Sequence, residues 1–124
     1  MKKDVIVYIE DILDGIAKIE EYTKKITENN FNKSTKIQDA VLRRLEIIGE
    51  AVKNIPQEMR GKYPDIPWKK IAGTRDVLIH EYSGVNLKRI WKVIKEDLID
   101  LKRNIQEIKK DLKNSNAGNG DKGA

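Results

Sequence analysis

Hydrophobic residues recur at intervals of three and four along most of this chain, which is the spacing of one face of an α-helix. The first run predicts a helix over about residues 4–28, which Asp4 is placed to cap. The second run predicts a helix that Ser34 caps and Pro56 ends. The apolar positions are Ile6, Ile9, Leu13, Ile16 and Ile19 in the first helix, and Ile37, Val41, Leu45, Ile48, Val52 and Ile55 in the second.

All three prolines lie between residues 56 and 73, where the regular pattern stops. We expect two short helical turns here, because proline suits the first position of a turn and glycine suits its end. The expected starts are Pro56 and Pro67, and the expected ends are Gly61 and Gly73. A third short helix should follow, with Thr74 as its cap and Gly84 at its end.

The last apolar run predicts a helix over about residues 87–113, capped by Asn86. The C-terminal residues 114–124 are small, polar and rich in glycine, so we expect a disordered tail. There is no strand-like alternation and no internal repeat. The sequence therefore predicts one all-α domain over residues 1–113, a bundle of three long helices plus short irregular helices.

Composition narrows the possible chemistry. A chain of 124 residues is one domain by its size. The absence of cysteine excludes disulfides, thiolate metal sites and cysteine nucleophiles, and it fits a cytoplasmic protein. No apolar run approaches the roughly 18 residues that a membrane-spanning helix needs, so we expect a soluble protein without a membrane span.

Positive charge gathers in one part of the chain. The net charge is +5, and residues 60–95 carry nine Lys and Arg against three acids. A local field of this kind attracts polyanions, including RNA and DNA. The alternative is a solvated face of a lysine-rich protein, a composition that growth at high temperature also favours.

The most informative stretch is GTRDVLIHEYSG, residues 73–84, which holds the only histidine, His80. On a helix, Arg75 and Tyr82 are seven residues apart and share a face. Asp76 lies one turn before His80, where its carboxylate can orient the imidazole. Arg75 and His80 are about 140° apart on an ideal helix. They converge if the helix frays at its end, or if a groove between two subunits collects both.

These residue types suit an RNA cleavage in which the 2′-hydroxyl attacks the adjacent phosphate. Histidine transfers protons near neutral pH, and arginine stabilises the charged phosphorane. This scheme needs no metal and no cofactor, and a carboxylate pair such as Glu46 and Glu50 is a weak signal for Mg²⁺. The reaction benefits from an acid and a base, so a single His80 favours a two-fold dimer with two copies around one groove. A helix-terminal or partly buried histidine remains the alternative.

Other residues have both a functional and a structural interpretation. Trp68 and Trp91 could stack on RNA bases, but their spacing beside isoleucines favours the core or a dimer interface. Gly49 favours the close approach of two helices. Surface ion pairs at spacings of three and four are expected among Arg43, Arg44, Glu46 and Glu50.

The segment RDVLIHEY reads as RxxxxHxY, and a family pattern surrounds it over residues 40–98, including IIGEA, PDIPW and the Ile90–Trp91 pair. This combination resembles HepT-type toxins of the HEPN superfamily. The resemblance covers about half of the chain strongly, and the N-terminal helix is compatible with it. The motif itself shows no departure from the family pattern.

The resemblance implies a homodimeric, metal-independent ribonuclease with a HEPN-like helical fold, which is the toxin of a two-gene toxin–antitoxin system. It implies that Arg75 and His80 are catalytic and that Asp76 supports them. It also implies a partner, a minimal nucleotidyltransferase antitoxin, that transfers AMP from ATP to Tyr82. The added bulk and negative charge near His80 would oppose an RNA phosphate.

Two other functions remain open at the level of sequence. The chain could be a non-catalytic module that docks the nucleotidyltransferase or holds a nucleotide, although a scaffold has no need for both Arg75 and His80. It could also be the antitoxin half of its pair. Tyr82 could simply anchor the end of a helix.

Overall fold

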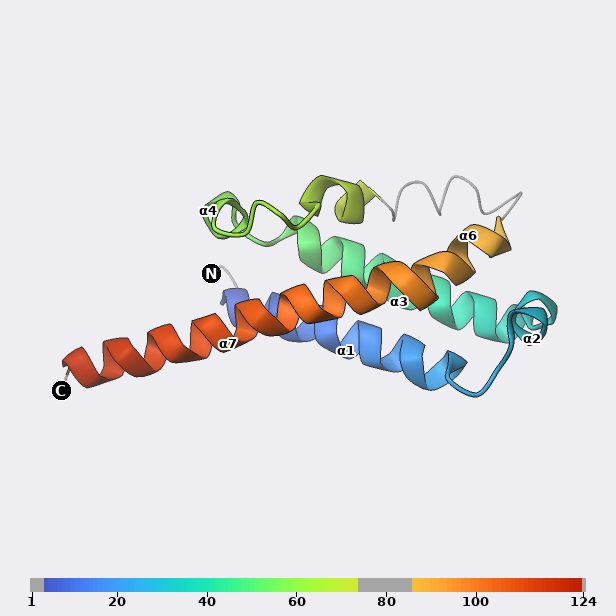
Figure 1. Ribbon diagram of the computed structural model, residues 1–124, viewed down its shortest axis with the longest axis horizontal. Coiled ribbons are helices and arrows are strands. Elements are labelled where there is room, and N and C mark those ends of the chain that lie inside the picture. Colours follow the sequence, from blue (N-terminus) through green and yellow to red (C-terminus); the bar gives the residue numbers. More distant parts are fainter. Residues whose placement is uncertain (1–3, 74–85, 124) are drawn as a thin grey trace.

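The computed structural model describes the backbone of residues 4–73 and 86–123, and side chains as far as residue 114. Three long helices extend along the longest axis of the molecule, and shorter helices accompany them (Figure 1). The long helices are α1 (Val5–Thr23), α3 (Thr35–Lys53) and α7 (Leu98–Gly123). The shorter elements are α2 (Glu28–Lys33), α4 (Gln57–Gly61), α6 (Leu87–Lys92) and the π-helix η2 (Val93–Asp97). These ranges contain no strand, so the predicted all-α class is confirmed for the part described.

An apolar core lies between the long helices. α1 packs mainly on α3 and also on α7. The inward-facing side chains of Ile9, Ile16 and Ile19 on α1 are at most 1% exposed, and Ile105 and Ile108 on α7 are fully buried. Burying one such side chain contributes roughly 1.5–3 kcal/mol, so this periodic stripe is what holds the bundle together.

α1 and α3 lie in close contact at Gly15. A β-carbon at this position would lie 2.7 Å from Cγ1 of Ile48 and 3.1 Å from its Cδ1. Only a residue without a side chain fits there. Gly49, at which we expected a close helix approach, is buried and borders a pocket described below.

The first helix ends earlier than predicted. α1 stops at Thr23, and a separate helix, α2, follows after a short turn. Thr27 and Asn30 form a reciprocal capping box at the start of α2, with N–H to side-chain distances of 3.1 and 3.2 Å. The predicted single helix over residues 4–28 is therefore wrong. The cap begins a new helix, which turns Phe31 into the core.

Two predicted caps are confirmed. At the start of α3, the Ser34 hydroxyl accepts a hydrogen bond from the backbone N–H of Ile37 at 3.2 Å. At the start of α6, the Asn86 side-chain oxygen accepts one from the N–H of Arg89 at 3.1 Å. Each bond satisfies a donor that the first turn of a helix leaves without a partner.

The last helix, predicted as continuous over residues 87–113, contains a π-helical segment at Val93–Asp97. Ile90, Ile94 and Leu98 follow one another in steps of four, which drift about 80° around a regular α-helix over two steps. A wider turn takes up part of this drift, so all three side chains stay buried.

α7 also continues past the predicted end near residue 113, to Gly123. A helix that is already nucleated adds one hydrogen bond for each further residue, without a new nucleation step. The expected tail over residues 114–124 overlaps this end of α7, and its disorder in solution stays a prediction.

The proline-rich segment follows the expected turns with a shift of one position. Pro56 and Pro67 each stand just before a helix instead of at its first position, and the N–H of Ile71 donates to the carbonyl oxygen of Pro67 at 3.0 Å. Gly61 ends α4 as expected, and Gly73 is still helical. No helix within residues 4–73 and 86–123 is long and apolar enough to cross a membrane.

Candidate functional site

The motif falls between two anchored elements. Its residues Arg75, Asp76, His80 and Tyr82 lie outside the described residues, as do Thr74 and Gly84, the expected ends of their helix. The chain enters the motif from a helix over residues 68–73 and leaves it into α6, which Asn86 caps. Figure 1 shows these two elements along one side of the bundle, joined by the grey trace.

Trp68 anchors the helix that leads into the motif. Its side chain is 7% exposed, and its indole N–H lies 3.0 Å from the carbonyl oxygen of Tyr63 and 3.2 Å from that of Arg60. A buried aromatic ring with a satisfied donor fixes the first turn of this helix against the bundle. Of the two interpretations of Trp68, the core one is confirmed.

Arg60 in turn fastens α4 to the end of α3. Its Nε donates to the carbonyl oxygen of Ile55 at 3.0 Å, and its Nη2 donates to those of Val52 and Lys53 at 2.8 and 3.1 Å. Val52 and Lys53 are the last two residues of α3 and Ile55 lies just beyond it, where the carbonyls lack the regular partners of a helix interior. No sequence pattern marks Arg60 for this role, because the role depends on α4 folding back onto the helix before it.

Tyr63 ties the same region to α7. Its hydroxyl donates to a carboxylate oxygen of Asp111 at 2.6 Å, across 48 residues of sequence. Burial raises the pKa of Tyr63 to about 12, and the hydrogen bond to Asp111 and the negative charges of Asp111 and Glu107 act in the same direction. The turn that precedes the motif is therefore tied both to the end of α3, through Arg60, and to α7, through Tyr63.

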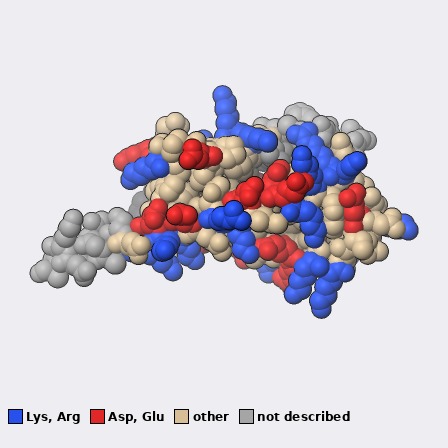
Figure 2. Space-filling model, in the orientation of Figure 1, with Lys and Arg blue, Asp and Glu red and all other residues tan. Residues whose placement is uncertain are grey.

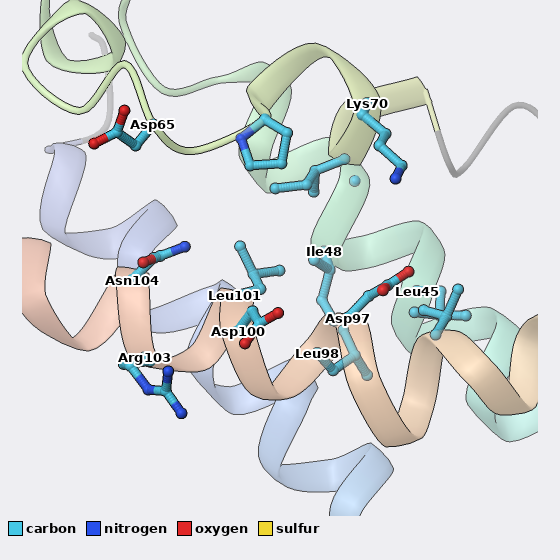
Figure 3. Close-up of a pocket in the computed structure, with 14 residues that line it drawn as sticks. Leu45, Ile48, Asp65, Lys70, Asp97, Leu98, Asp100, Leu101, Arg103 and Asn104 are labelled. Carbon is cyan, nitrogen blue, oxygen red and sulfur yellow. The ribbon is translucent and has the colours of Figure 1, made fainter.

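A pocket of about 390 Å³ lies between α3, residues 65–71 and the η2–α7 segment (Figure 3). Its apolar walls include Leu45, Ile48, Ile71, Leu98 and Leu101. Its rim carries polar side chains, with Asp65 and Lys70 on one side and Asp97 and Asp100 on the other. No sequence pattern marks this pocket, because it is built from three segments that are distant in the chain. The carboxylates on its rim disfavour a polyanion.

Basic side chains flank the undescribed segment on both sides in sequence. Lys69 and Lys70 precede it, and Lys88, Lys92 and Lys95 follow it; all five are exposed. Figure 2 shows Lys and Arg side chains over α6, with acidic side chains further along the same face. The positive charge predicted around the motif is thus at the surface.

Trp91 lies at the boundary between the core and the surface. It is partly buried and packs against Phe31, with ring centroids 5.4 Å apart. The Lys95 ammonium lies 4.7 Å from the centre of its ring. These contacts favour the expectation that Trp91 belongs to the edge of the core.

One of the expected surface ion pairs is confirmed. Arg43 Nη1 lies 3.6 Å from a carboxylate oxygen of Glu46, one helical turn away, and both side chains are accessible to solvent. A pair of this kind is worth about 0–1 kcal/mol. Among residues whose side chains the structure describes, no group of three or more His, Asp or Glu is arranged to hold a metal ion.

Comparison with known proteins identifies relatives of this chain. A family described as ribonuclease HepT-like matches residues 12–108, a range that includes the whole motif. The chain is 46% identical over 110 residues to "Probable ribonuclease HepT" of Thermococcus cleftensis, covering 89% of this chain and 100% of that protein. No solved structure matches it.

A second relative is longer than this chain. The chain is 53% identical over 117 residues to "Gamma-glutamylcyclotransferase and putative RNase" of Methanocaldococcus jannaschii, covering 94% of this chain and 53% of that protein. The chain thus spans about half the length of that relative. The helical bundle and the matched range define the class as an all-α, ribonuclease-type domain. More particularly, the chain belongs to the HepT-like ribonuclease family.

Proposed function

We propose that this protein is a metal-independent endoribonuclease and the toxin of a toxin–antitoxin pair. One observation carries the proposal: the RxxxxHxY motif at residues 75–82 falls inside the range that matches the HepT-like family. The names of its relatives support the same activity, since they include ribonuclease or RNase.

The proposed chemistry uses the substrate's own nucleophile. A base removes the proton from a ribose 2′-hydroxyl, and the oxygen attacks the adjacent phosphorus. The bond to the 5′-oxygen of the next nucleotide breaks, and that oxygen takes up a proton. The products carry a 2′,3′-cyclic phosphate and a free 5′-hydroxyl. His80 transfers protons, Arg75 stabilises the negative charge on the phosphorane, and Asp76 orients the imidazole.

The surroundings of the motif support this role. Trp68 holds the incoming helix by two hydrogen bonds from its indole, and Asn86 caps the outgoing one. Catalytic groups act best on rigid supports, because the geometry of the transition state is exacting. The exposed lysines on both sides favour an anionic substrate.

The proposed working form is a homodimer. Proton transfer to the leaving oxygen and from the nucleophile needs two groups, and the chain has one histidine. A two-fold axis would bring His80 and Arg75 of both subunits to one groove. Light scattering at micromolar concentration should give twice the 14.3 kDa mass of the chain. A monomer would contradict this part.

The proposed regulation is AMPylation of Tyr82 by a minimal nucleotidyltransferase. A nucleotide on this tyrosine adds bulk and negative charge two residues from His80, which would exclude an RNA phosphate. Incubation with the partner and ATP, followed by peptide mass spectrometry, should map the added AMP to Tyr82. If the mass maps elsewhere, this part of the proposal is wrong.

The activity is tested by RNA cleavage with purified protein in the presence of EDTA. We expect the wild type to cleave, and both His80→Ala and Arg75→Ala to lose activity. Arg103→Ala, at an exposed position on α7, is the matched control for removal of an arginine and should cleave like the wild type. Absence of cleavage by wild-type protein of unmodified intact mass would contradict the enzyme and favour a docking module.

A further inference from the structure

The helix that follows the motif presents a row of lysines. Lys88, Lys92 and Lys95 are spaced by four and three residues, which places them on one face of α6 and of η2, where Lys95 is the middle residue. All three are exposed, and no acidic residue occurs between residues 86 and 95. We call these three residues the α6 basic face.

These charges are not neutralised within the part of the chain that the structure describes. Lys88 and Lys92 make no ion pair there, and Lys95 lies over the ring of Trp91. Like charges one turn apart destabilise a helix by a few tenths of a kcal/mol. The repulsion between these lysines is relieved when a polyanion lies along the row.

The row is also held in a defined place. On the opposite side of the same elements, Ile90 and Ile94 are buried in the core, 1% and 6% exposed. The Asn86 cap fixes the first turn, and the contact between Lys95 and Trp91 restrains the last lysine. A polyanion would therefore meet charges that are already positioned.

The α6 basic face lies close to the motif along the chain. Lys88 follows Tyr82 by six positions in the sequence, a distance of at most about 20 Å for a fully extended chain. On the far side, Asp97 and Asp100 line the neighbouring pocket and would repel phosphates. Figure 2 shows this change of sign along one face of the molecule.

We propose that the α6 basic face is the binding track for single-stranded RNA, and that it guides the phosphates of the substrate to the motif. The proposal rests on the proposed ribonuclease function and names the surface that function would use. The RNA follows the lysines as far as Lys95 and turns away from the bundle beyond it, where Glu96 and Asp97 make the charge negative. Lys88, Lys92 and Lys95 position the substrate and take no part in proton transfer.

The test measures binding separately from cleavage. The probe is a fluorescein-labelled oligouridine with 2′-O-methyl riboses, which lacks the nucleophilic hydroxyl and is not cut by the proposed chemistry. Fluorescence anisotropy at a series of KCl concentrations gives the Kd and its salt dependence. Each phosphate neutralised on a single strand contributes about 0.7 to the slope of log affinity against log salt.

Lys88→Gln/Lys92→Gln should weaken binding and lower this slope by about 1.4, because two phosphate contacts are lost. The matched control is Lys110→Gln/Lys113→Gln, which makes the same change of net charge at exposed positions on α7. It should leave the slope unchanged. With ordinary RNA, the α6 variant should raise KM and leave kcat as in the wild type.

Three outcomes would overturn the proposal: no RNA binding by the wild type, an unchanged slope in the α6 variant, or an equal loss in the α7 control. The test also separates the two proposals. Binding that depends on Lys88 and Lys92 without any cleavage of ordinary RNA contradicts the enzyme and supports the track. Cleavage of ordinary RNA together with an unchanged salt slope in the α6 variant supports the enzyme and contradicts the track.

Discussion

Removal of the Arg60 side chain tests the link that holds the turn before the motif. In the structure its guanidinium bridges the end of α3 and α4 through three carbonyl oxygens. The bonds to Ile55 and Val52 are partly buried, and the bond to Lys53 is exposed. In Arg60→Ala the two partly buried carbonyls lose a charged donor.

The expected loss follows from those two bonds. A hydrogen bond from a charged donor contributes about 1.5–3 kcal/mol when its acceptor is buried. Partial exposure lets water replace some of each bond, so we take the lower value for both and expect Arg60→Ala to lose about 3 kcal/mol of unfolding free energy. For a domain of this size the corresponding decrease in Tm is about 10 °C.

Urea denaturation followed by far-UV circular dichroism measures this loss. Arg103→Ala is the control, since Arg103 is exposed and its side chain makes no ion pair or hydrogen bond within the described residues. Arg60→Lys should recover part of the stability, because an ammonium can reach some of the same carbonyls. Ordinary surface substitutions change the unfolding free energy by up to about 0.5 kcal/mol. A smaller loss than this for Arg60→Ala would refute the role of Arg60 in linking α4 to the end of α3.

Three further substitutions test other parts of the fold. Gly15→Ala should destabilise the protein by about 1 kcal/mol in urea, because the new β-carbon meets Ile48, whereas Gly61→Ala, with nothing within 4 Å, should not. Asn86→Ala should lose about 1 kcal/mol through the missing cap, and an unchanged Tm would contradict the cap. Tyr63 has its pKa raised from 10.0 to about 12, so the stability it adds relative to Tyr63→Phe should be constant below pH 10 and disappear as the pH rises to about 12. A stability difference between the wild type and Tyr63→Phe that stays constant from pH 10 to about 12 would contradict the raised pKa of Tyr63.

The apolar runs of the long helices and two of the expected caps could be predicted from sequence because they depend on local patterns, whereas the Asp4 side chain, also expected to cap, makes no capping hydrogen bond. Ser34 and Asn86 each precede an apolar run, and both cap as expected. The break after Thr23 is also encoded locally, in Thr27 and Asn30, but the apolar periodicity before it predicts a single helix that continues to about residue 28. A cap signal of four residues, Thr27 to Asn30, is easily outweighed by an apolar periodicity that extends over a whole helix.

Contacts between distant segments could not be predicted in the same way. Arg60 acts on carbonyls five to eight residues earlier, and Tyr63 acts on Asp111, 48 residues later. Both depend on how the turn over residues 56–67 folds back. The π-helix at Val93–Asp97 is a tertiary effect as well, since it follows from keeping three residues buried in steps of four.

The candidate site likewise has features that are local in sequence and features that depend on contacts between distant segments. Its motif and family could be identified from sequence, because RxxxxHxY is a pattern of residue types at fixed spacing. Its supports could not, because Trp68 and Arg60 act through backbone carbonyls, which carry no signal of residue type.

The central claim is that the 2′-hydroxyl of RNA is the nucleophile and that His80 moves its proton. The most direct measurement is the chemical identity of the ends produced by wild-type protein in EDTA, determined by mass spectrometry of a short RNA product. We predict a 2′,3′-cyclic phosphate on one fragment and a 5′-hydroxyl on the other, with neither formed by His80→Ala. A 5′-phosphate and a 3′-hydroxyl, or cyclic phosphate formed equally by His80→Ala, would contradict the proposed mechanism.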